Sequence, residues 1–262
     1  MRTIILMFFV LASFNIALSA IKGVDVQYTA DGITMKGYLV YDDAVKGKRP
    51  GVLVVHEWWG YNDYARKRAT MLAELGYTAL AIDMFGDGKQ AAHPDDAGKF
   101  AGEVMKNMPG AKARFLAAME TLKQHETVDT SNVGAIGYCF GGGVVLNMVR
   151  MGVDLKGVVT FHGSLGAATE AKKGDIKTKV LVCHGAADEF ATKADIDNFK
   201  KEMRDADIDC TFKSYPGAKH SFTNPAADEY GKKFKIPLAY NAKADKNSWN
   251  DMKAFFKKTF KK

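Results

Sequence analysis

The sequence predicts an α/β protein built on one mostly parallel sheet with helices on both of its faces. Short apolar runs rich in β-branched residues recur along the chain, and amphipathic segments of helical period separate them. Strands that are apolar throughout are typical of a sheet covered on both faces. The 262 residues, 47% of them apolar and 26% charged, suffice for one such domain.

The order of the predicted elements begins with a β-hairpin, because two β-prone runs within residues 24–41 flank the turn signal Asp31-Gly32. The predicted parallel strands are GVLVVH (51–56), TALAIDM (78–84), VGAIG (133–137), VVTFH (158–162), KVLVCH (179–184) and CTFKSY (210–215). The predicted helices cover residues 62–75, 95–107, 111–125, 192–205 and 246–258, and another begins near Gly142. Ligands of such a sheet bind outside the carboxyl ends of its strands, so functional residues should follow these runs directly.

The first twenty residues, MRTIILMFFVLASFNIALSA, have the layout of a secretory signal peptide. Arg2 precedes an apolar centre at residues 4–11, and small residues precede Ala20. The apolar centre is too short for a spanning helix, which needs about 20 apolar residues. We therefore expect residues 1–20 to be cleaved and residues 21–262 to form a single domain. The mature protein is expected to be periplasmic or secreted, without stable membrane insertion.

Charge and cysteine content restrict the remaining function classes. The formal charge of +7 is densest among the lysines of the last thirty residues, and no nucleic-acid-binding motif accompanies them. The three cysteines leave at least one thiol without an intrachain partner, and no two of them form C-x-x-C. The sequence therefore predicts no nucleic-acid partner, no metal site and no organic cofactor, and it leaves the oligomeric state open.

The stretch GAIGYCFGGG (134–143) places a thiol among five glycines, directly after a predicted strand. Its centre, GYCFG, fits the nucleophile-elbow pattern G-x-S-x-G with Cys139 in place of serine. A helix N-terminus aimed at the sulfur stabilises a thiolate, and the amide of Phe140 becomes a candidate oxyanion donor. The stretch lacks the G-K-[ST] of a phosphate loop and the spacing of a dinucleotide-binding turn.

A thiol nucleophile also needs a proton acceptor, and that acceptor needs an orienting group. Asp188 follows the strand at 179–184, and His220 follows the strand at 210–215. Nucleophile, acid and histidine occur in this order along the chain in α/β-hydrolases. The sequence therefore predicts a triad of Cys139, Asp188 and His220.

With these residues in view, the sequence resembles the dienelactone hydrolase family of α/β-hydrolases over essentially the whole chain after residue 20. Four motifs in the family's order carry the likeness: HEWWG (56–60), GYCFGG (137–142), HGxxD (184–188) and YPGAxHxF (215–222). The resemblance implies the α/β-hydrolase fold and the hydrolysis of esters or lactones.

The resemblance also implies roles for particular residues. The family's catalytic cysteine, aspartate and histidine correspond to Cys139, Asp188 and His220. Its glutamate that interacts with the resting thiol corresponds to Glu57, and the amide of Trp58 would be the second oxyanion donor. A substrate-binding serine of the family corresponds to Ser221. Apart from the resemblance, four aromatic residues near strand ends are further candidates for the substrate pocket, although aromatic residues at such positions are as often part of the core: Trp58, Trp59, Phe85 and Tyr138.

The sequence departs from the family where two arginines would hold a substrate carboxylate. Asp87 and Asn224 stand at these positions. An unpaired buried carboxylate is costly, so we expect neutral esters or lactones to be preferred unless Lys89 or another cation takes over the role. Two other function classes remain open: an exported binding protein that hydrolyses nothing, and a redox protein that uses Cys139.

Overall fold

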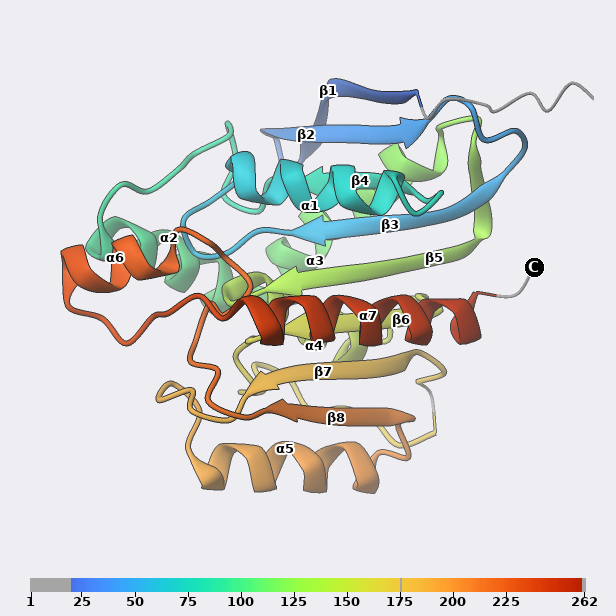
Figure 1. Ribbon diagram of the computed structural model, residues 1–262. Helices are drawn as coiled ribbons and strands as arrows, with labels where there is room; N and C mark the ends of the chain where they lie inside the picture. The colour runs from blue at the N-terminus through green and yellow to red at the C-terminus, as the bar shows by residue number, and fades with distance from the viewer. Residues whose placement is uncertain (1–19, 175, 261–262) are drawn as a thin grey trace, which may run out of the picture.

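The computed structural model describes residues 20–174 and 176–260. The predicted signal peptide, apart from Ala20, lies outside the described residues. The described residues form one eight-stranded sheet with the order β1-β2-β4-β3-β5-β6-β7-β8 (Figure 1). Its strands are β1 (Ile21–Ala30), β2 (Ile33–Asp42), β3 (Arg49–Val55), β4 (Thr78–Ile82), β5 (Val128–Tyr138), β6 (Gly157–Phe161), β7 (Lys179–Gly185) and β8 (Cys210–Tyr215).

The sheet is parallel from β4 to β8, and the predicted hairpin β1–β2 is confirmed at one edge. Asp31 and Gly32 both have positive φ, as a tight two-residue hairpin turn requires, and Ala30 pairs with Ile33 across it. The strand β2 continues the sheet by pairing antiparallel with β4. The other neighbouring pairs from β3–β4 to β7–β8 are parallel. The predicted fold class is therefore confirmed.

Helices cover both faces of this sheet. They are α1 (Asp63–Ala73), α2 (Pro94–Lys106), α3 (Met108–Lys123), α4 (Phe140–Arg150), α5 (Lys193–Asp205), α6 (Ala227–Phe234) and α7 (Ala242–Thr259). Side chains of α1 and α7 join one apolar core with Val52 and Val54 of β3. Side chains of α3, α4 and α5 join the other core with Leu53 and Val55. Because successive strand residues point to opposite faces, an uninterrupted apolar strand fills both cores.

Some boundaries differ from the sequence-based prediction. The strand β5 begins at Val128 rather than at residue 133, because Val128 and Asp129 pair with Arg49 and Pro50 before the register shifts. The helix α7 begins at Ala242, where the side chain of Asn241 accepts a hydrogen bond from the Ala244 amide. The helix α6 was not predicted, since it is short and only its first residue is buried.

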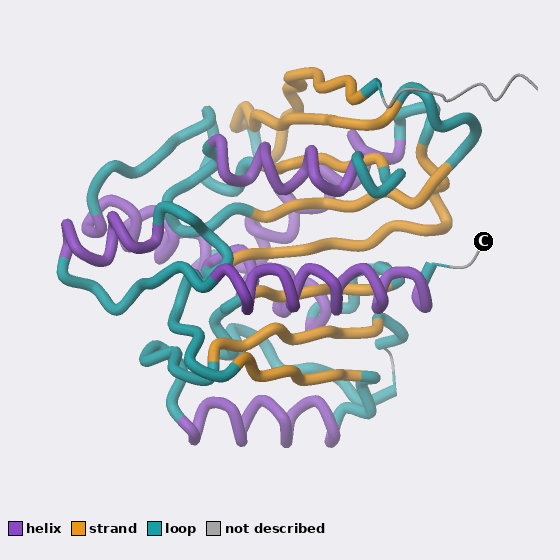
Figure 2. Tube along the Cα trace, viewed as in Figure 1, coloured by secondary structure: helices purple, strands orange, loops and turns teal. Residues whose placement is uncertain are grey.

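The carboxyl ends of the parallel strands meet at one edge of the sheet, on the left in Figure 1. In Figure 2 the long loops gather at this edge, and α2 and α6 lie beside them. Within residues 20–174 and 176–260, no helix combines the length and apolarity needed to cross a membrane. The candidate functional residues lie on the loops at this edge.

Candidate functional site

Cys139 lies between the end of β5 and the start of α4, on a backbone turn with φ 52° and ψ −116°. A residue other than glycine at positive φ is strained by about 1–3 kcal/mol, and the surrounding structure has to hold it there. The first amides of α4 lie next to the sulfur because Cys139 is the residue that precedes the helix. The turn therefore has the strained strand-to-helix geometry of a nucleophile elbow.

Two of the glycines around Cys139 are required by close backbone contacts. A Cβ atom on Gly137 would lie 2.1 Å from the carbonyl oxygen of Gly141. A Cβ atom on Gly141 would lie 2.4 Å from the carbonyl oxygen of Val55 and 2.5 Å from that of His56. A larger residue at position 137 would collide with the first turn of α4, and one at position 141 would collide with the backbone at the end of β3. The two glycines thus allow the close backbone packing that holds Cys139 in place.

His220 and Asp188 approach Cys139 from two separate loops. The Nδ1 atom of His220 lies 2.8 Å from Oδ2 of Asp188, and both side chains are almost fully buried. Burial lowers the pKa of His220, but attraction to Cys139 and the hydrogen bonds with Asp188 and Cys139 raise it overall to about 10. These contacts favour a positive charge on the His220 ring, which lies between Cys139 and the Asp188 carboxylate.

The carboxylate of Asp188 is fixed by a second contact, because Oδ1 accepts a hydrogen bond of 2.9 Å from the amide of Phe190. Burial alone would raise the pKa of Asp188, but the hydrogen bond from His220 and the charge of that ring lower it overall. Asp188 therefore stays ionised and holds the His220 ring in one orientation.

Glu57, the predicted partner of the resting thiol, is almost fully buried, with 2% of its surface exposed. Its Oε1 atom accepts a hydrogen bond of 2.8 Å from the Ser221 hydroxyl, and its Oε2 atom accepts one of 2.6 Å from the Asn224 amide. Burial raises the pKa of Glu57, although both hydrogen bonds and the charge of His220 oppose the change. The structure thus places the Glu57 carboxylate on Ser221 and Asn224, whereas the family resemblance implies an interaction with the resting thiol of Cys139.

Cys139, His220 and Asp188 border a cavity of about 350 Å³. The helix α2 supplies one wall of it through the side-chain face formed by residues 101, 102 and 105. Phe190, which is 55% exposed, forms another wall, and its ring centre lies 4.8 Å from that of His220. Apart from Asp188 and His220, the lining side chains are uncharged. The cavity therefore suits an uncharged, largely apolar ligand.

The two predicted oxyanion donors are placed at this cavity, since both Trp58 and Phe140 line it. Neither backbone amide has a hydrogen-bond acceptor among the described residues. Both N–H groups are therefore available to an oxygen that develops negative charge beside the Cys139 sulfur.

Four of the predicted substrate-binding residues do not line this cavity. Tyr138 is fully buried on the other face of the sheet and stacks on Phe161, because strand residues alternate between the two faces. Trp59 packs against Tyr230 of α6. Phe85 packs between other buried aromatic rings, and the Ser221 hydroxyl is bonded to Glu57. The aromatic residues near strand ends thus serve mainly as core.

The sequence-based prediction missed the residues that shape the cavity walls. On α2 these are Ala101, Gly102 and Met105, whose types carry no chemical signal. Phe190 follows Asp188 by two residues, and this proximity in the sequence was the one available indication that it lies at the site. Within the described residues, no group of three or more histidines, cysteines, aspartates or glutamates is arranged to hold a metal ion.

The three thiols differ in their surroundings, and all are free among the described residues. Cys183 is fully buried in the core and accepts a hydrogen bond from the Tyr215 hydroxyl, and its burial raises the pKa of the thiol to about 12. Burial likewise raises the pKa of Cys210 to about 12. Of the three, only Cys139 lines the cavity beside His220.

Comparison with known proteins agrees with this arrangement. The sequence profile of the dienelactone hydrolase family matches residues 35–260. The chain is 29% identical to protein usf of Aquifex pyrophilus over 237 residues, which are 88% of this chain and 96% of that protein. The solved structure of m3DLH superposes with a TM-score of 0.88 at 38% identity, covering 92% of this chain and all of the other.

A second solved structure, a dienelactone hydrolase-like promiscuous phosphotriesterase from metagenomic libraries, is 34% identical with a TM-score of 0.84. It covers 92% of this chain and 100% of the other. The family match spans most of the chain, and it includes every candidate residue of the site from Glu57 to His220. The chain therefore belongs to the dienelactone hydrolase family of α/β-hydrolases and is an ester or lactone hydrolase.

Proposed function

We propose that the protein hydrolyses neutral esters or lactones with Cys139 as nucleophile, His220 as proton carrier and Asp188 as the group that orients His220. One observation carries the proposal. The thiol stands on a strained turn, contacts the Asp188-bonded imidazole and borders a cavity that no lysine or arginine of the described residues lines. A nucleophile, a base and an orienting acid in contact are the pattern of covalent acyl transfer.

The proposed reaction begins with a thiolate–imidazolium pair of Cys139 and His220. The sulfur attacks the substrate carbonyl carbon, and the amides of Phe140 and Trp58 stabilise the oxyanion, each contributing about 3 kcal/mol in comparable sites. His220 gives its proton to the leaving alkoxide, which leaves an acyl-cysteine. The neutral imidazole then takes a proton from water as the water attacks the acyl carbon. Release of the acid restores the thiolate and the imidazolium.

The preference for neutral substrates is supported by the charges around the cavity. None of the described residues that line it is a lysine or an arginine. Lys89 lines a different cavity and lies 3.9 Å from Asp87. The Asn224 amide is bonded to Glu57 and does not line the cavity. A substrate carboxylate would therefore meet no lysine or arginine in the cavity, and the His220 imidazolium there is already paired with Asp188 and Cys139, so burial of the carboxylate is unfavourable.

The experiment that tests this proposal measures kcat/KM for a neutral lactone and for its analogue with a free carboxylate near the reacting carbonyl. We expect a preference of more than tenfold for the neutral compound, since one charge-pair partner is typically worth about 2–5 kcal/mol. Cys139→Ala should abolish turnover, whereas Cys183→Ala serves as the matched control thiol. A clear preference for the acid would contradict the neutral-substrate proposal, and turnover by Cys139→Ala would contradict the nucleophile.

A second candidate activity is the hydrolysis of neutral phosphotriesters. It rests on the similarity to the promiscuous phosphotriesterase and on the uncharged cavity beside Cys139. A chromogenic dialkyl aryl phosphate tests it on the same purified protein. Release of the aryl alcohol that requires Cys139 supports this activity, and its absence at millimolar substrate rejects it.

We propose in addition that residues 1–20 act as a signal peptide and that the enzyme works outside the cytoplasm. The support is the charge and apolarity pattern of these residues. N-terminal sequencing of exported protein should find a chain that begins at Ala20 or Ile21. An intact Met1 on a membrane-bound product would reject the proposal.

A further inference from the structure

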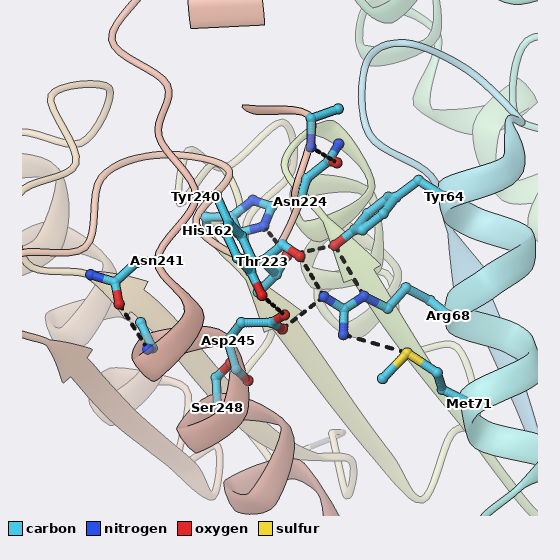
Figure 3. Close-up of polar contacts among 12 residues, drawn as sticks. Tyr64, Arg68, Met71, His162, Thr223, Asn224, Tyr240, Asn241, Asp245 and Ser248 are labelled. Carbon is cyan, nitrogen blue, oxygen red and sulfur yellow. Dashed lines mark hydrogen bonds and ion pairs between the residues drawn. The ribbon is translucent and has the colours of Figure 1, made fainter. Parts of the chain in front are cut away.

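A buried arginine that belongs to no predicted motif lies behind the candidate active site. Arg68 of α1 is 3% exposed and pairs with Asp245 of α7 at 2.7 Å. Its Nε atom donates to the Tyr64 hydroxyl, and its Nη2 atom donates to the carbonyl oxygen of Thr223 (Figure 3). One guanidinium thus joins two helices to the segment that follows β8. A charge buried at this depth needs such a set of partners.

Thr223 receives contacts from three directions. Its hydroxyl lies 2.6 Å from the Tyr64 hydroxyl and 2.7 Å from Nε2 of His162, in addition to the contact of its carbonyl oxygen with Arg68. The His162 ring in turn packs edge-on against the His220 ring, with 5.4 Å between the ring centres. Thr223 is fully buried and cannot exchange these partners for water.

The segment that Thr223 anchors carries the chemistry of the site. It runs from His220 to Asn224. His220 is the proposed proton carrier, and the side chains of Ser221 and Asn224 donate hydrogen bonds to Glu57. Ser221 has φ 55°, a conformation that costs free energy for any residue other than glycine. A strained turn keeps its shape only where the surroundings fix it, and Thr223 is the residue of this turn that is tied to α1.

We propose that Arg68 is a positioning residue: paired with Asp245 and assisted by Tyr64, it holds Thr223 and so fixes the His220–Asn224 turn. The inference rests on the proposed function, because it assigns His220 and Glu57 to the active site. Arg68 itself touches no substrate in this arrangement, since it is not among the residues that line the cavity. Burial raises the pKa of Glu57, and the positive charge of Arg68 is one of the smaller effects that oppose this rise.

The test separates positioning from stability by replacing the whole ion pair. Exchange of a buried pair for apolar residues of similar size is often neutral for folding, whereas removal of one partner is not. The double variant R68M/D245L should therefore keep a melting temperature within a few degrees of the wild type. We expect its kcat on a neutral ester to fall at least tenfold with KM changed less than threefold, since the cavity walls remain. R68K keeps the charge and should recover part of the loss.

A second readout does not depend on ester turnover. Alkylation of Cys139 by iodoacetamide, followed by mass spectrometry across pH 5 to 10, should be slower at neutral pH in R68M/D245L, because His220 is no longer held against the thiol. The matched control is R66M/D25L, which makes the same exchange at the pair that joins α1 to β1. This control should leave kcat and alkylation unchanged.

The outcomes are distinct. A folded R68M/D245L protein with wild-type kcat and wild-type alkylation would overturn the proposal. If that variant does not fold, R68K tests the same anchor: it keeps the charge but cannot bond the Thr223 carbonyl oxygen, Tyr64 and Asp245 at once, and we expect at least a threefold loss of kcat. Wild-type kcat in R68K would then overturn the proposal. If the wild type hydrolyses no ester or lactone, the proposed function fails, and the alkylation profiles still decide whether Arg68 positions His220.

Discussion

Replacing Cys139 by alanine should lower the pKa of His220, and this change reports directly on the proposed thiolate–imidazolium pair. His220 is 8% exposed, so burial by itself opposes its positive charge. Attraction to Cys139 is the largest of the effects that favour the charge, and the hydrogen bond with Asp188 follows. The substitution removes the attraction to Cys139. The hydrogen bond with Asp188, which raises the pKa, and burial, which lowers it, remain.

The magnitude follows from the contacts of the ring. The pKa of His220 rises from about 6.5, the ordinary value of histidine, to about 10. An opposite charge in contact typically accounts for about 1–3 pKa units. We therefore expect Cys139→Ala to lower the pKa of His220 by at least about 1 unit, with Asp188 retaining the remainder.

The assay is a pH titration of imidazole nitrogen resonances in protein labelled at histidine, with His220→Gln used to assign the signal. Wild-type His220 should remain protonated through pH 8, and Cys139→Ala should titrate at lower pH. Cys183→Ala is the control, because that thiol lies in the core and contacts Tyr215. The same His220 titration in wild type and Cys139→Ala, or a neutral wild-type ring at pH 7, would refute the reasoning.

Three further predictions concern neighbouring residues. Asp188→Asn should lower kcat about 10⁴-fold with the fold intact, because the amide favours the wrong tautomer of His220; kinetics near the wild-type rate would contradict this. Gly102→Val should lower kcat/KM at least tenfold for bulky esters but not for acetates, since the added side chain enters open space of the cavity. Gly98→Val, at an exposed position of the same helix, is the control, and equal losses of kcat/KM in the two variants would contradict the prediction. Because its pKa is higher in the folded than in the unfolded state, protonated His220 contributes to the free energy of unfolding fully below pH 6.5, and this contribution is lost as pH rises through about 10. The free energies of unfolding of wild type and His220→Gln, measured by urea titration, should therefore converge at alkaline pH.

The sequence by itself determined the fold class and predicted the three residues that we propose as the catalytic triad. Uninterrupted apolar strands require cover on both faces, so the strand pattern specified a parallel sheet flanked by helices. Cys139, Asp188 and His220 each follow a strand, and the ends of parallel strands converge at one edge of the sheet. Local order along the chain was therefore enough to bring these side chains to the same place.

The partners of Glu57 and the walls of the cavity were decided by tertiary structure alone. Glu57 and Asn224 are 167 residues apart in the sequence, and nothing near either residue indicates that they form a hydrogen bond. The wall residues Ala101 and Gly102 are small and chemically silent, and they matter only because α2 packs over Cys139. Conversely, Tyr138 is adjacent to Cys139 in the sequence but does not line the cavity, because its side chain points to the opposite face of the sheet.

The Arg68 cluster shows the physical reason for this division. A strand or a helix start is encoded by neighbouring residues, whose propensities and periodicity are visible in the sequence. The ion pair between Arg68 and Asp245 spans 177 residues, and its contact with Thr223 spans 155. Such contacts form only after helices and loops have packed, since their geometry depends on the positions of three separate elements. The sequence therefore predicted the residues that we propose to react, and the packing of distant segments decided how they are held.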